Sequence, residues 1–149
     1  MKLRIYLDTS VISACVDERT PERLEETRGF WKRLGTFDVT TSDLVRQEIG
    51  RTGDDRQRSA MLELLSSTRE IAASEEARGL ATQYVQRGLF GPTMHDDALH
   101  LAIAVLSRQD ILVSWNFKHL VNRRKRAQVS EVNTLMGLPT IEILAPSEL

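Results

Sequence analysis

Four oxygen-bearing side chains stand at points of the chain where an α/β fold would bring them together. Asp8 ends a short apolar run, and Glu48 faces inward on an otherwise apolar helix pattern. Asp97 falls in the first turn of a strongly apolar helix pattern, and Asn116 follows a late apolar run. Three carboxylates brought together repel one another, which raises their pKa values unless a cation shares them. Because Mg²⁺ and Mn²⁺ take carboxylate, amide and water oxygens, the four residues predict a divalent-metal site that activates water.

Each of these residues also has a purely structural interpretation. Asp8 could cap the turn that follows it, and Glu48 could be a solvated helix residue. Asp96 and Asp97 could both serve only the dipole of the helix that they begin. Asn116 by itself would be an ordinary turn residue. The case for chemistry therefore rests on all four occurring in this order, each at an appropriate place on its element.

Strands and helices are expected to alternate along the chain. The strand patterns lie at residues 3–7, 37–41, 68–72, 111–114 and 140–144. A helix can start at Thr9-Ser10, and others are expected over residues 20–34, 42–49, 54–66, 74–88, 96–108 and 129–136, with hydroxyl caps at Thr20 and Ser42. This alternation favours a mostly parallel sheet with helices on both faces. Without a linker or repeat, residues 1–149 are expected to form one α/β domain.

Composition narrows the class of protein. The net charge of −1 gives no whole-molecule field that would favour nucleic acid or a membrane, although a local basic patch would suffice for RNA. A single cysteine, Cys15, excludes an intramolecular disulfide and suits a reducing compartment. The histidines His95, His100 and His119 lack the spacing of a zinc motif. Without a long apolar run or a signal-peptide pattern, we expect a cytoplasmic protein with no membrane partner.

Five stretches of the chain resemble the PIN-domain family, and within it the VapC-type toxins of bacterial toxin–antitoxin pairs. They are LRIYLDTSVIS, TTSDLVRQEI, HDDALHLAIAV, DILVSWNFKHL and GLPTIEILAPSEL. The resemblance runs over nearly the full length. It implies a single PIN-like domain and a metal-dependent endoribonuclease that hydrolyses RNA phosphodiesters with Mg²⁺ or Mn²⁺.

The family's acidic positions match this chain residue by residue. Asp8, Glu48 and Asp97 correspond to the metal ligands, the last because it directly precedes the Ala-Leu-His-Leu-Ala run. Many PIN domains carry a fourth Asp where this chain has Asn116. An Asn keeps an oxygen but loses one negative charge, which bears on the binding of a second metal ion. The resemblance implies that Asn116 shares in catalysis.

Further residues are expected around this centre. The hydroxyl of Thr9 or Ser10 could hold a water of the ion's shell or a phosphate oxygen, and Asp96 could be a supporting or capping residue. His100 lies one turn beyond Asp97 and could orient a carboxylate, or could simply be a packed, satisfied histidine. Candidate RNA contacts, each with an equally open surface role, are Lys118, His119, Arg123, Arg124, Lys125 and Arg126.

Two other functions are considered beside the ribonuclease. A phosphatase could use Asp8 as its nucleophile, but such chemistry wants a second acid two residues on, where this chain has Ser10. A PIN-like module could bind RNA or protein without cutting, which the Asn116 substitution favours. The toxin interpretation predicts a cognate antitoxin at the acidic groove. A homodimer is implied by the resemblance alone, since the apolar residues Phe30 and Trp31, expected at the surface, do not define an interface.

Overall fold

Five parallel strands form the central sheet of the computed structural model, which describes residues 1–149. They are β1 (Arg4–Leu7), β2 (Asp38–Ser42), β3 (Arg69–Ile71), β4 (Ile111–Val113) and β5 (Glu142–Leu144), in the order β3-β2-β1-β4-β5. Every neighbouring pair is parallel. The sheet expected to be mostly parallel is therefore entirely so, and the expected strands lie within two residues of the observed ones.

Seven α-helices connect the strands. They are α1 (Thr9–Ala14), α2 (Pro21–Lys32), α3 (Asp43–Gly50), α4 (Asp55–Leu65), α5 (Glu75–Gln86), α6 (His95–Leu106) and α7 (Arg123–Leu135). Three short 3-10 turns lie at Leu34–Thr36, Pro92–Met94 and Pro146–Glu148. No helix combines the length and the apolar character needed to cross a bilayer.

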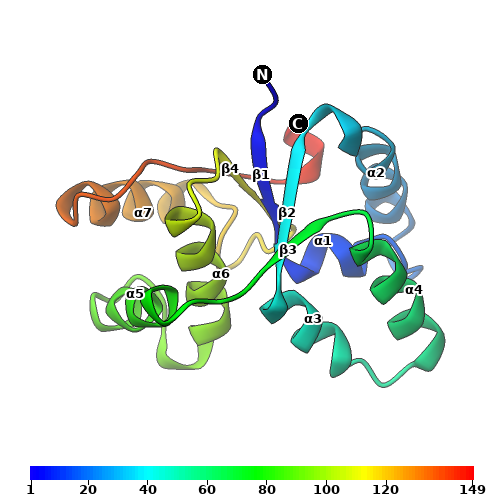
Figure 1. Cartoon of the computed structure of the whole chain (residues 1–149), viewed down its shortest axis with the longest axis horizontal. Coiled ribbons are helices and arrows are strands. Elements are labelled where there is room, and N and C mark those ends of the chain that lie inside the picture. The colour runs from blue at the N-terminus through cyan, green and yellow to red at the C-terminus, as the bar shows by residue number, and fades with distance from the viewer.

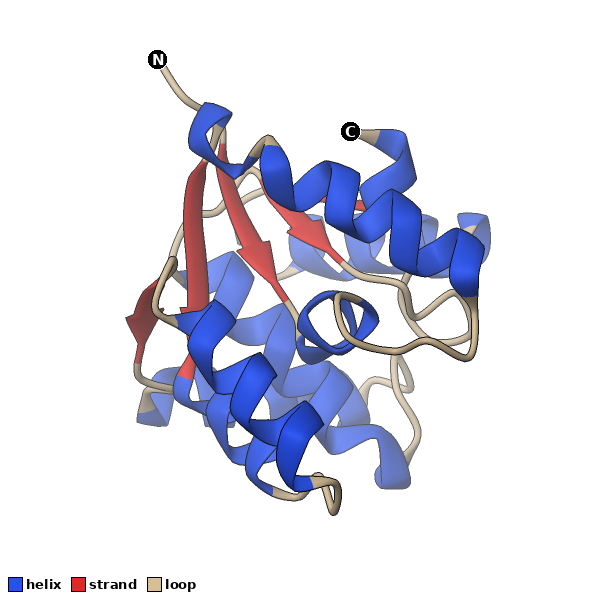
Figure 2. Ribbon diagram, turned by 90° about the vertical axis from the view of Figure 1, so that its right-hand side faces the viewer, coloured by secondary structure: helices blue, strands red, loops and turns tan.

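The helices cover the sheet in two layers. Helices α1 to α4 lie on one face and α5 to α7 on the other (Figures 1 and 2). The strand order explains this division, because the chain moves from β1 outward to β3 and then returns to β4 and β5 in the opposite direction. Since parallel crossovers are right-handed, the two directions place their helices on opposite faces. The strand order thus reverses between β1 and β4, which is where α/β folds bind ligands.

The core is centred on β1, β4 and α6. Ile5, Leu7 and Leu112 have no exposed surface, as expected for strands covered on both sides. In α6 every residue from Ala98 to Val105 is buried. This confirms the prediction of a central helix. Because α6 is enclosed on most sides, its first turn, which carries Asp97, is held in a fixed position above the sheet edge.

Several local predictions were wrong. Ser42 and Thr20 occupy the N-cap positions of α3 and α2, but neither side chain makes a capping hydrogen bond. The Ser42 hydroxyl lies 2.7 Å from the Tyr6 hydroxyl instead. Phe30 is fully buried and packs near Phe37, with ring centroids 6.0 Å apart, so it forms no part of the surface. Tertiary packing therefore determines the hydrogen-bond and packing partners of these side chains, and they differ from those that local sequence rules predict.

Candidate active site

The predicted site residues gather at the carboxyl edge of the sheet, on both sides of the point where the strand order reverses. Asp8 follows β1 directly, and Asn116 follows β4. Glu48 lies on α3, the helix that leaves β2, and Asp97 lies in the first turn of α6. In Figure 1 the carboxyl ends of β1 and β2 point toward α1 and α3. The amino end of α6, on the other face of the sheet, lies near the same ends of the strands. Parallel strands and short connections therefore bring together residues from distant parts of the sequence.

Asp8 is a buried carboxylate held by hydroxyl groups. Its Oδ1 accepts hydrogen bonds from the Ser10 backbone N–H at 3.1 Å and from the Ser10 hydroxyl at 2.5 Å. Its Oδ2 accepts from the Ser114 hydroxyl at 2.5 Å. The bond to the Ser10 backbone makes Asp8 the N-cap of α1, so the capping interpretation is also correct. Asp8 is also only 4% exposed. An N-cap requires neither this burial nor the two hydrogen bonds from hydroxyl groups, so capping alone does not explain the site.

Asp8 forms no ion pair with a cationic side chain, and the charge of His100 balances it only in part. Burial raises the pKa of this carboxyl, while the charge of His100 and the hydrogen bonds from Ser10 and Ser114 lower it, and the charge of Asp97 raises it further. No lysine or arginine forms an ion pair with Asp8. A buried anion of this kind is costly unless a cation binds beside it.

A chain of hydrogen bonds runs through the protein to Glu48. The His100 Nε2 donates to Glu48 Oε1 at 2.5 Å, and the Thr9 hydroxyl donates to the same oxygen at 2.7 Å. On the other side of the ring, His100 Nδ1 lies 2.8 Å from the Tyr6 hydroxyl, which also contacts Ser42. His100 therefore orients a carboxylate, as one interpretation expected, but that carboxylate is Glu48 and not one on its own helix.

The pair of His100 and Glu48 favours the charged form of both groups. Burial lowers the pKa of His100, but the hydrogen bond with Glu48 and the charges of Asp8, Glu48 and Asp97 outweigh it, so the pKa lies above 6.5. Burial raises the pKa of Glu48, but the hydrogen bond and charge of His100, with the Thr9 hydroxyl, bring it below 4.5. The three carboxylates and His100 thus form one electrostatic cluster.

Asp97 is held by two residues from the loop after β4. His119 Nδ1 lies 2.7 Å from Asp97 Oδ2, and the Asn116 side-chain amide donates to Asp97 Oδ1 at 3.4 Å. The Asn116 Oδ1 accepts from the His119 backbone N–H at 2.9 Å, which fixes the amide orientation. His119 was predicted as a possible RNA contact, which stays a prediction, and its ring contacts an acid of the site. Asn116 joins the cluster as predicted.

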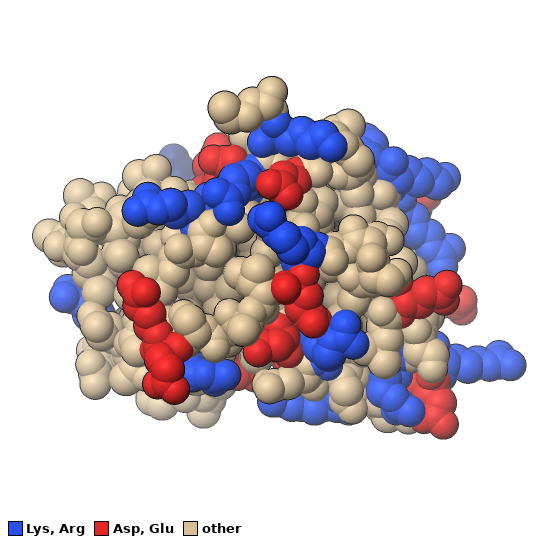
Figure 3. All heavy atoms as spheres, viewed as in Figure 1, with Lys and Arg blue, Asp and Glu red and all other residues tan.

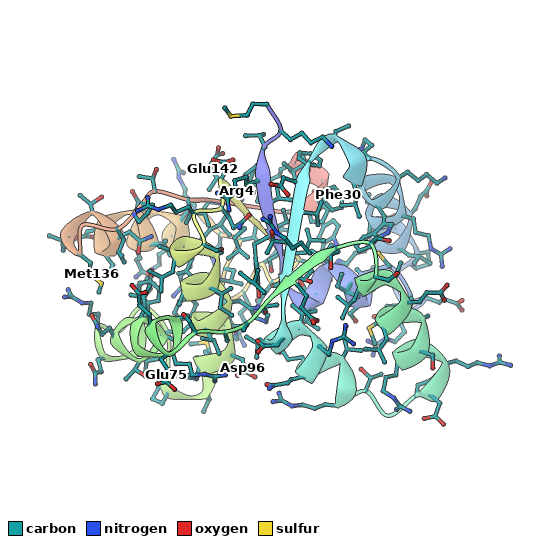
Figure 4. The ribbon with its side chains drawn as sticks, in the orientation of Figure 1. Arg4, Phe30, Glu75, Asp96, Met136 and Glu142 are labelled. Atoms are coloured by element: carbon teal, nitrogen blue, oxygen red, sulfur yellow. The ribbon has the colours of Figure 1, made fainter.

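Asp96 points away from the other acids. It forms an ion pair with Arg51 at 3.2 Å, and its side chain is 45% exposed. Figure 4 shows it at the end of α6 that faces α3. The N-cap residue of α6 is Met94, and no side chain makes a capping hydrogen bond there, so Asp96 does not cap the helix. Asp96 therefore ties α6 to α3 at the surface and supports Asp97 only indirectly.

The basic cluster at the start of α7 is divided between structure and surface. The Lys125 ammonium donates to the Leu89 carbonyl and lies 4.7 Å from the Phe90 ring centroid, while Arg126 pairs with Glu148 at 2.8 Å. Arg123 and Arg124 are exposed. Figure 3 shows positive and negative side chains interspersed over the face that it presents, without a broad region of one sign.

A small cavity collects part of this cluster. It has a volume of about 290 Å³, and its lining includes Lys118, Arg124 and Lys125. Burial lowers the pKa of Lys125, as does the charge of Arg124, while the charge of Asp97 opposes them. The beginning of α7 is therefore within electrostatic reach of the acidic cluster. RNA binding by these residues stays a prediction.

The donor types of the cluster fit a divalent cation, although the side chains are not arranged around one. No three His, Cys, Asp or Glu side chains are grouped closely enough to hold an ion. Glu48 and Asp97 instead engage His100 and His119. Glu48 accepts the hydrogen bonds from Thr9 and His100 through the same oxygen, Oε1, and accepts neither of them through Oε2. The buried charge of Asp8, which forms no ion pair, and an all-oxygen donor set of carboxylates and one amide suit Mg²⁺ or Mn²⁺.

Sequence reasoning missed Tyr6 and Ser114. Tyr6 is the polar-tipped residue of β1, and Ser114 follows β4 immediately, so a signal existed in both places. Ser114 donates to Asp8 and accepts from the Asn116 backbone N–H at 2.9 Å. The hydroxyl of Thr9 or Ser10 was considered as a group that could hold a water of the ion's shell or a phosphate oxygen, and this stays a prediction. In the structure the Thr9 hydroxyl donates to Glu48 and the Ser10 hydroxyl to Asp8.

Comparisons with known proteins find likeness in structure and not in sequence. No protein-family model and no curated protein matches the chain. The crystal structure of Mycobacterium tuberculosis VapC20, described as a sarcin-ricin loop cleaving toxin, is similar with a TM-score of 0.61 and 17% identity over 77% of this chain and 92% of that one.

Two complexes contain chains that are similar over a longer range. One is DNA-bound VapBC from Salmonella typhimurium, with a TM-score of 0.61 and 16% identity over 97% of this chain and 98% of that one. The other is VapBC2 from Rickettsia felis bound to a promoter DNA fragment, with a TM-score of 0.56 and 18% identity over 95% and 98% of the two chains. At this level of identity the likeness establishes the fold. The chain has a PIN-like fold, the fold of the VapC toxins of VapBC toxin–antitoxin systems.

Proposed function

We propose that this protein is a Mg²⁺- or Mn²⁺-dependent endoribonuclease that hydrolyses RNA phosphodiesters. The observation that carries the proposal is Asp8, a buried carboxylate without a cationic partner at the point of strand-order reversal in a VapC-like fold. Stability alone would not favour a charge there. Glu48 and Asp97 contribute the further acids that a divalent cation would balance.

Each residue of the cluster has a defined task in this proposal. Asp8, Glu48 and Asp97 would hold the ion, and Asn116 would place its amide beside Asp97. The bound ion would supply an activated water and stabilise the charge that develops on the phosphodiester. The hydroxyls of Ser10 and Ser114 fix the direction of the Asp8 carboxylate.

The two histidines orient the remaining acids. His100 holds Glu48 Oε1 and leaves Oε2 for the ion, whereas His119 holds Asp97 Oδ2 and the Asn116 amide lies 3.4 Å from Oδ1. Such hydrogen bonds fix the direction of a ligand and tune its basicity. The hydroxyls of Thr9, Ser10 and Ser114 donate to these carboxylates and hold them in place.

We further propose that the ribonuclease is the toxin of a toxin–antitoxin pair in the cytoplasm. Glu48 and Asp97 are each about a quarter exposed and lack a lysine or arginine partner, so the acidic groove would accept a basic segment of an antitoxin. The similar structures from Salmonella typhimurium and Rickettsia felis are VapBC complexes, which supports this assignment. Homodimer formation remains part of the proposal.

Cleavage of single-stranded and structured RNA with Mg²⁺, with Mn²⁺ and with EDTA tests the activity. Asp8→Asn and Asp97→Asn are expected to lose cleavage, whereas Glu63→Gln, which changes an exposed acid on α4, should cleave normally. Cleavage that persists in EDTA, or full activity of both site variants, would contradict the assignment.

A non-catalytic PIN-like module is the second candidate. The pairing of Glu48 with His100 and of Asp97 with His119 favours it, because both acids are already satisfied in part without a cation. This candidate predicts RNA or protein binding that EDTA leaves unchanged, together with no cleavage of any RNA class. Calorimetric titration with Mn²⁺ separates the two functions, since only the ribonuclease requires an ion site that Asp8→Asn removes.

A further inference from the structure

A cavity of about 320 Å³ opens beside the acidic cluster and shares two residues with it. Ser10 and Asn116 belong to both. The remaining lining comes from α1, the turn before α2, the first turn of α2 and Trp115. A group bound in this cavity would therefore lie next to the proposed site of cleavage.

Arg23 lies against two aromatic rings beside this cavity. Its guanidinium carbon is 5.0 Å from the centroid of Trp115 and 5.8 Å from that of Phe117. The rings themselves stand edge to face, with centroids 6.0 Å apart. The indole of Trp115 is fixed in place, because its N–H donates to the Thr27 hydroxyl at 2.9 Å. We refer to Arg23, Trp115 and Phe117 as the stacking platform.

The platform is available to a ligand on both its charged and its aromatic side. The Arg23 side chain takes part in no ion pair and donates no hydrogen bond within the protein. Phe117 is 47% exposed, one of few large apolar side chains that remain at the surface. A solvent-facing phenyl ring and an unpaired arginine beside a phosphodiester-cleaving site are the groups that bind bases and phosphates.

The local charge also permits an anion. Asp17, the acid that lines the cavity, accepts from Arg19 Nε at 3.0 Å and from Arg19 Nη2 at 2.9 Å. These bonds hold the pKa of Asp17 at about 2, with a smaller contribution from the charge of Arg23. Since Arg19 neutralises Asp17, Arg23 provides the net positive charge of the cavity.

We propose that the stacking platform and its cavity bind one unpaired nucleotide of the RNA strand, adjacent to the phosphodiester that is cut. Arg23 contacts the phosphate of that nucleotide, and its base stacks on the exposed ring of Phe117. The proposal rests on the proposed ribonuclease function. It deepens that function by assigning the residues that hold the nucleotide next to the cut, which must be unpaired because a base within a duplex cannot reach an aromatic ring.

Binding without cleavage tests the subsite separately from catalysis. We would measure fluorescence anisotropy of a labelled single-stranded RNA and of its duplex in EDTA, with Asp8→Asn in every protein. Arg23→Ala is expected to weaken single-strand binding about tenfold and to lower the salt dependence by about one phosphate contact. Phe117→Ala should weaken it about tenfold with the salt dependence unchanged, and Phe117→Tyr should restore it. Arg78→Ala, on exposed α5 surface, is the matched control.

A second readout reports on the platform directly. The chain has two tryptophans, so a Trp31→Phe background leaves Trp115 as the fluorophore. Single-stranded RNA is expected to change its emission, and Arg23→Ala should reduce that change at equal RNA concentration. Thermal denaturation of each variant identifies those that fail to fold, and Arg23→Gln, which also removes the charge, then replaces Arg23→Ala.

The outcomes separate the subsite from the ribonuclease. Normal cleavage with unchanged RNA affinity in Arg23→Ala and Phe117→Ala would overturn the subsite and leave the ribonuclease intact. Absence of cleavage by the unmodified chain, with affinity that still depends on both residues, would overturn the ribonuclease and support the subsite. Equal loss of single-strand and duplex affinity, or an antitoxin peptide that alone depends on the platform, would show that no unpaired nucleotide is recognised there.

Discussion

The amino and carboxyl ends of the strands form two edges of the central sheet, and these edges differ in how their acidic side chains are paired. At the amino edge, acids meet basic residues or backbone donors: Asp110 accepts from the Arg4 backbone N–H at 2.8 Å, and Asp38 lies 3.9 Å from Arg69. At the carboxyl edge, Asp8 has only hydroxyl and backbone partners and Glu48 depends on a histidine. The amino edge is arranged for stability, whereas the carboxyl edge stores a cost that a bound cation would relieve.

Cavity size does not reveal this difference. The larger cavity, about 850 Å³, lies at the amino edge and is lined by residues that include Arg4 and Asp110. The cavity beside the acids measures about 320 Å³. The buried charge without an ion pair, and not the open volume, marks the edge where we propose the active site.

The largest expected effect is that of Asp8→Asn at the carboxyl edge. Asp8→Asn should abolish metal-dependent cleavage, by about a thousandfold or more, and should raise the free energy of unfolding in EDTA by about 1 kcal/mol. The gain arises because a neutral amide is less costly to bury than a carboxylate without a cation. RNA cleavage assays and urea denaturation measure the two quantities.

Asp110→Asn is the matched change at the amino edge. It weakens the bond from the Arg4 backbone and should lower stability by up to about 1 kcal/mol, with cleavage unchanged. If Asp8→Asn destabilised the protein as Asp110→Asn does, the contrast between the edges would be lost.

The second effect concerns the hydrogen-bond chain behind Glu48. His100→Ala should lower the free energy of unfolding by about 3 kcal/mol, because it leaves a cavity and removes partners from Glu48 and Tyr6. Tyr6→Phe keeps the ring and loses only the hydroxyl contacts, at about 1 kcal/mol. Denaturation gives both values. Mn²⁺ titration should show weaker binding for His100→Ala than for Tyr6→Phe, and equal binding would deny His100 its orienting role.

The third effect is a pH dependence confined to the carboxyl edge. In EDTA, the stability from the raised pKa of His100 is fully present below 6.5 and is lost as pH rises through that raised value. The lowered pKa of Glu48 contributes above 4.5 and is lost as pH falls through its folded value. The pair should therefore stabilise most between these limits. Thermal unfolding from pH 4 to 9 should show this maximum, and His100→Gln should flatten its alkaline side.

The smallest effect is expected for the exposed pair at the amino edge. Asp38→Asn removes the partner of Arg69 at 3.9 Å, where both side chains are about half exposed. Such pairs contribute less than about 0.5 kcal/mol and weaken with salt. Denaturation at low and high ionic strength checks this, and a loss above 1 kcal/mol would mean that charge pairing matters more at this edge than we infer.

Much of the architecture was predictable from local patterns. Alternating strand and helix composition indicated a parallel α/β domain, and the apolar run after Asp97 indicated a central helix. The positions of Asp8 and Asn116 at strand ends followed from the same patterns, because parallel strands present their carboxyl ends at one edge. These properties depend on residues close in sequence, which is why periodicity detects them.

The partners of each side chain were decided by tertiary structure. His100 was expected either to orient a carboxylate or to be a packed histidine, and it contacts Glu48 on α3, while Asp96 pairs with Arg51. Such choices depend on the rotation and crossing of helices that are remote in sequence, which no local pattern encodes.

By itself, the sequence determined the order of elements, the parallel sheet and the acids near its carboxyl edge, since these depend on local periodicity and chain direction. Only the tertiary structure decided that Asp8 lacks a cationic partner while His100 and His119 hold the other two acids. It also placed Arg23 against Trp115 and Phe117, more than eighty residues away along the chain. The physical reason is that desolvation and hydrogen-bond geometry are properties of an assembled environment, to which each residue contributes only one part.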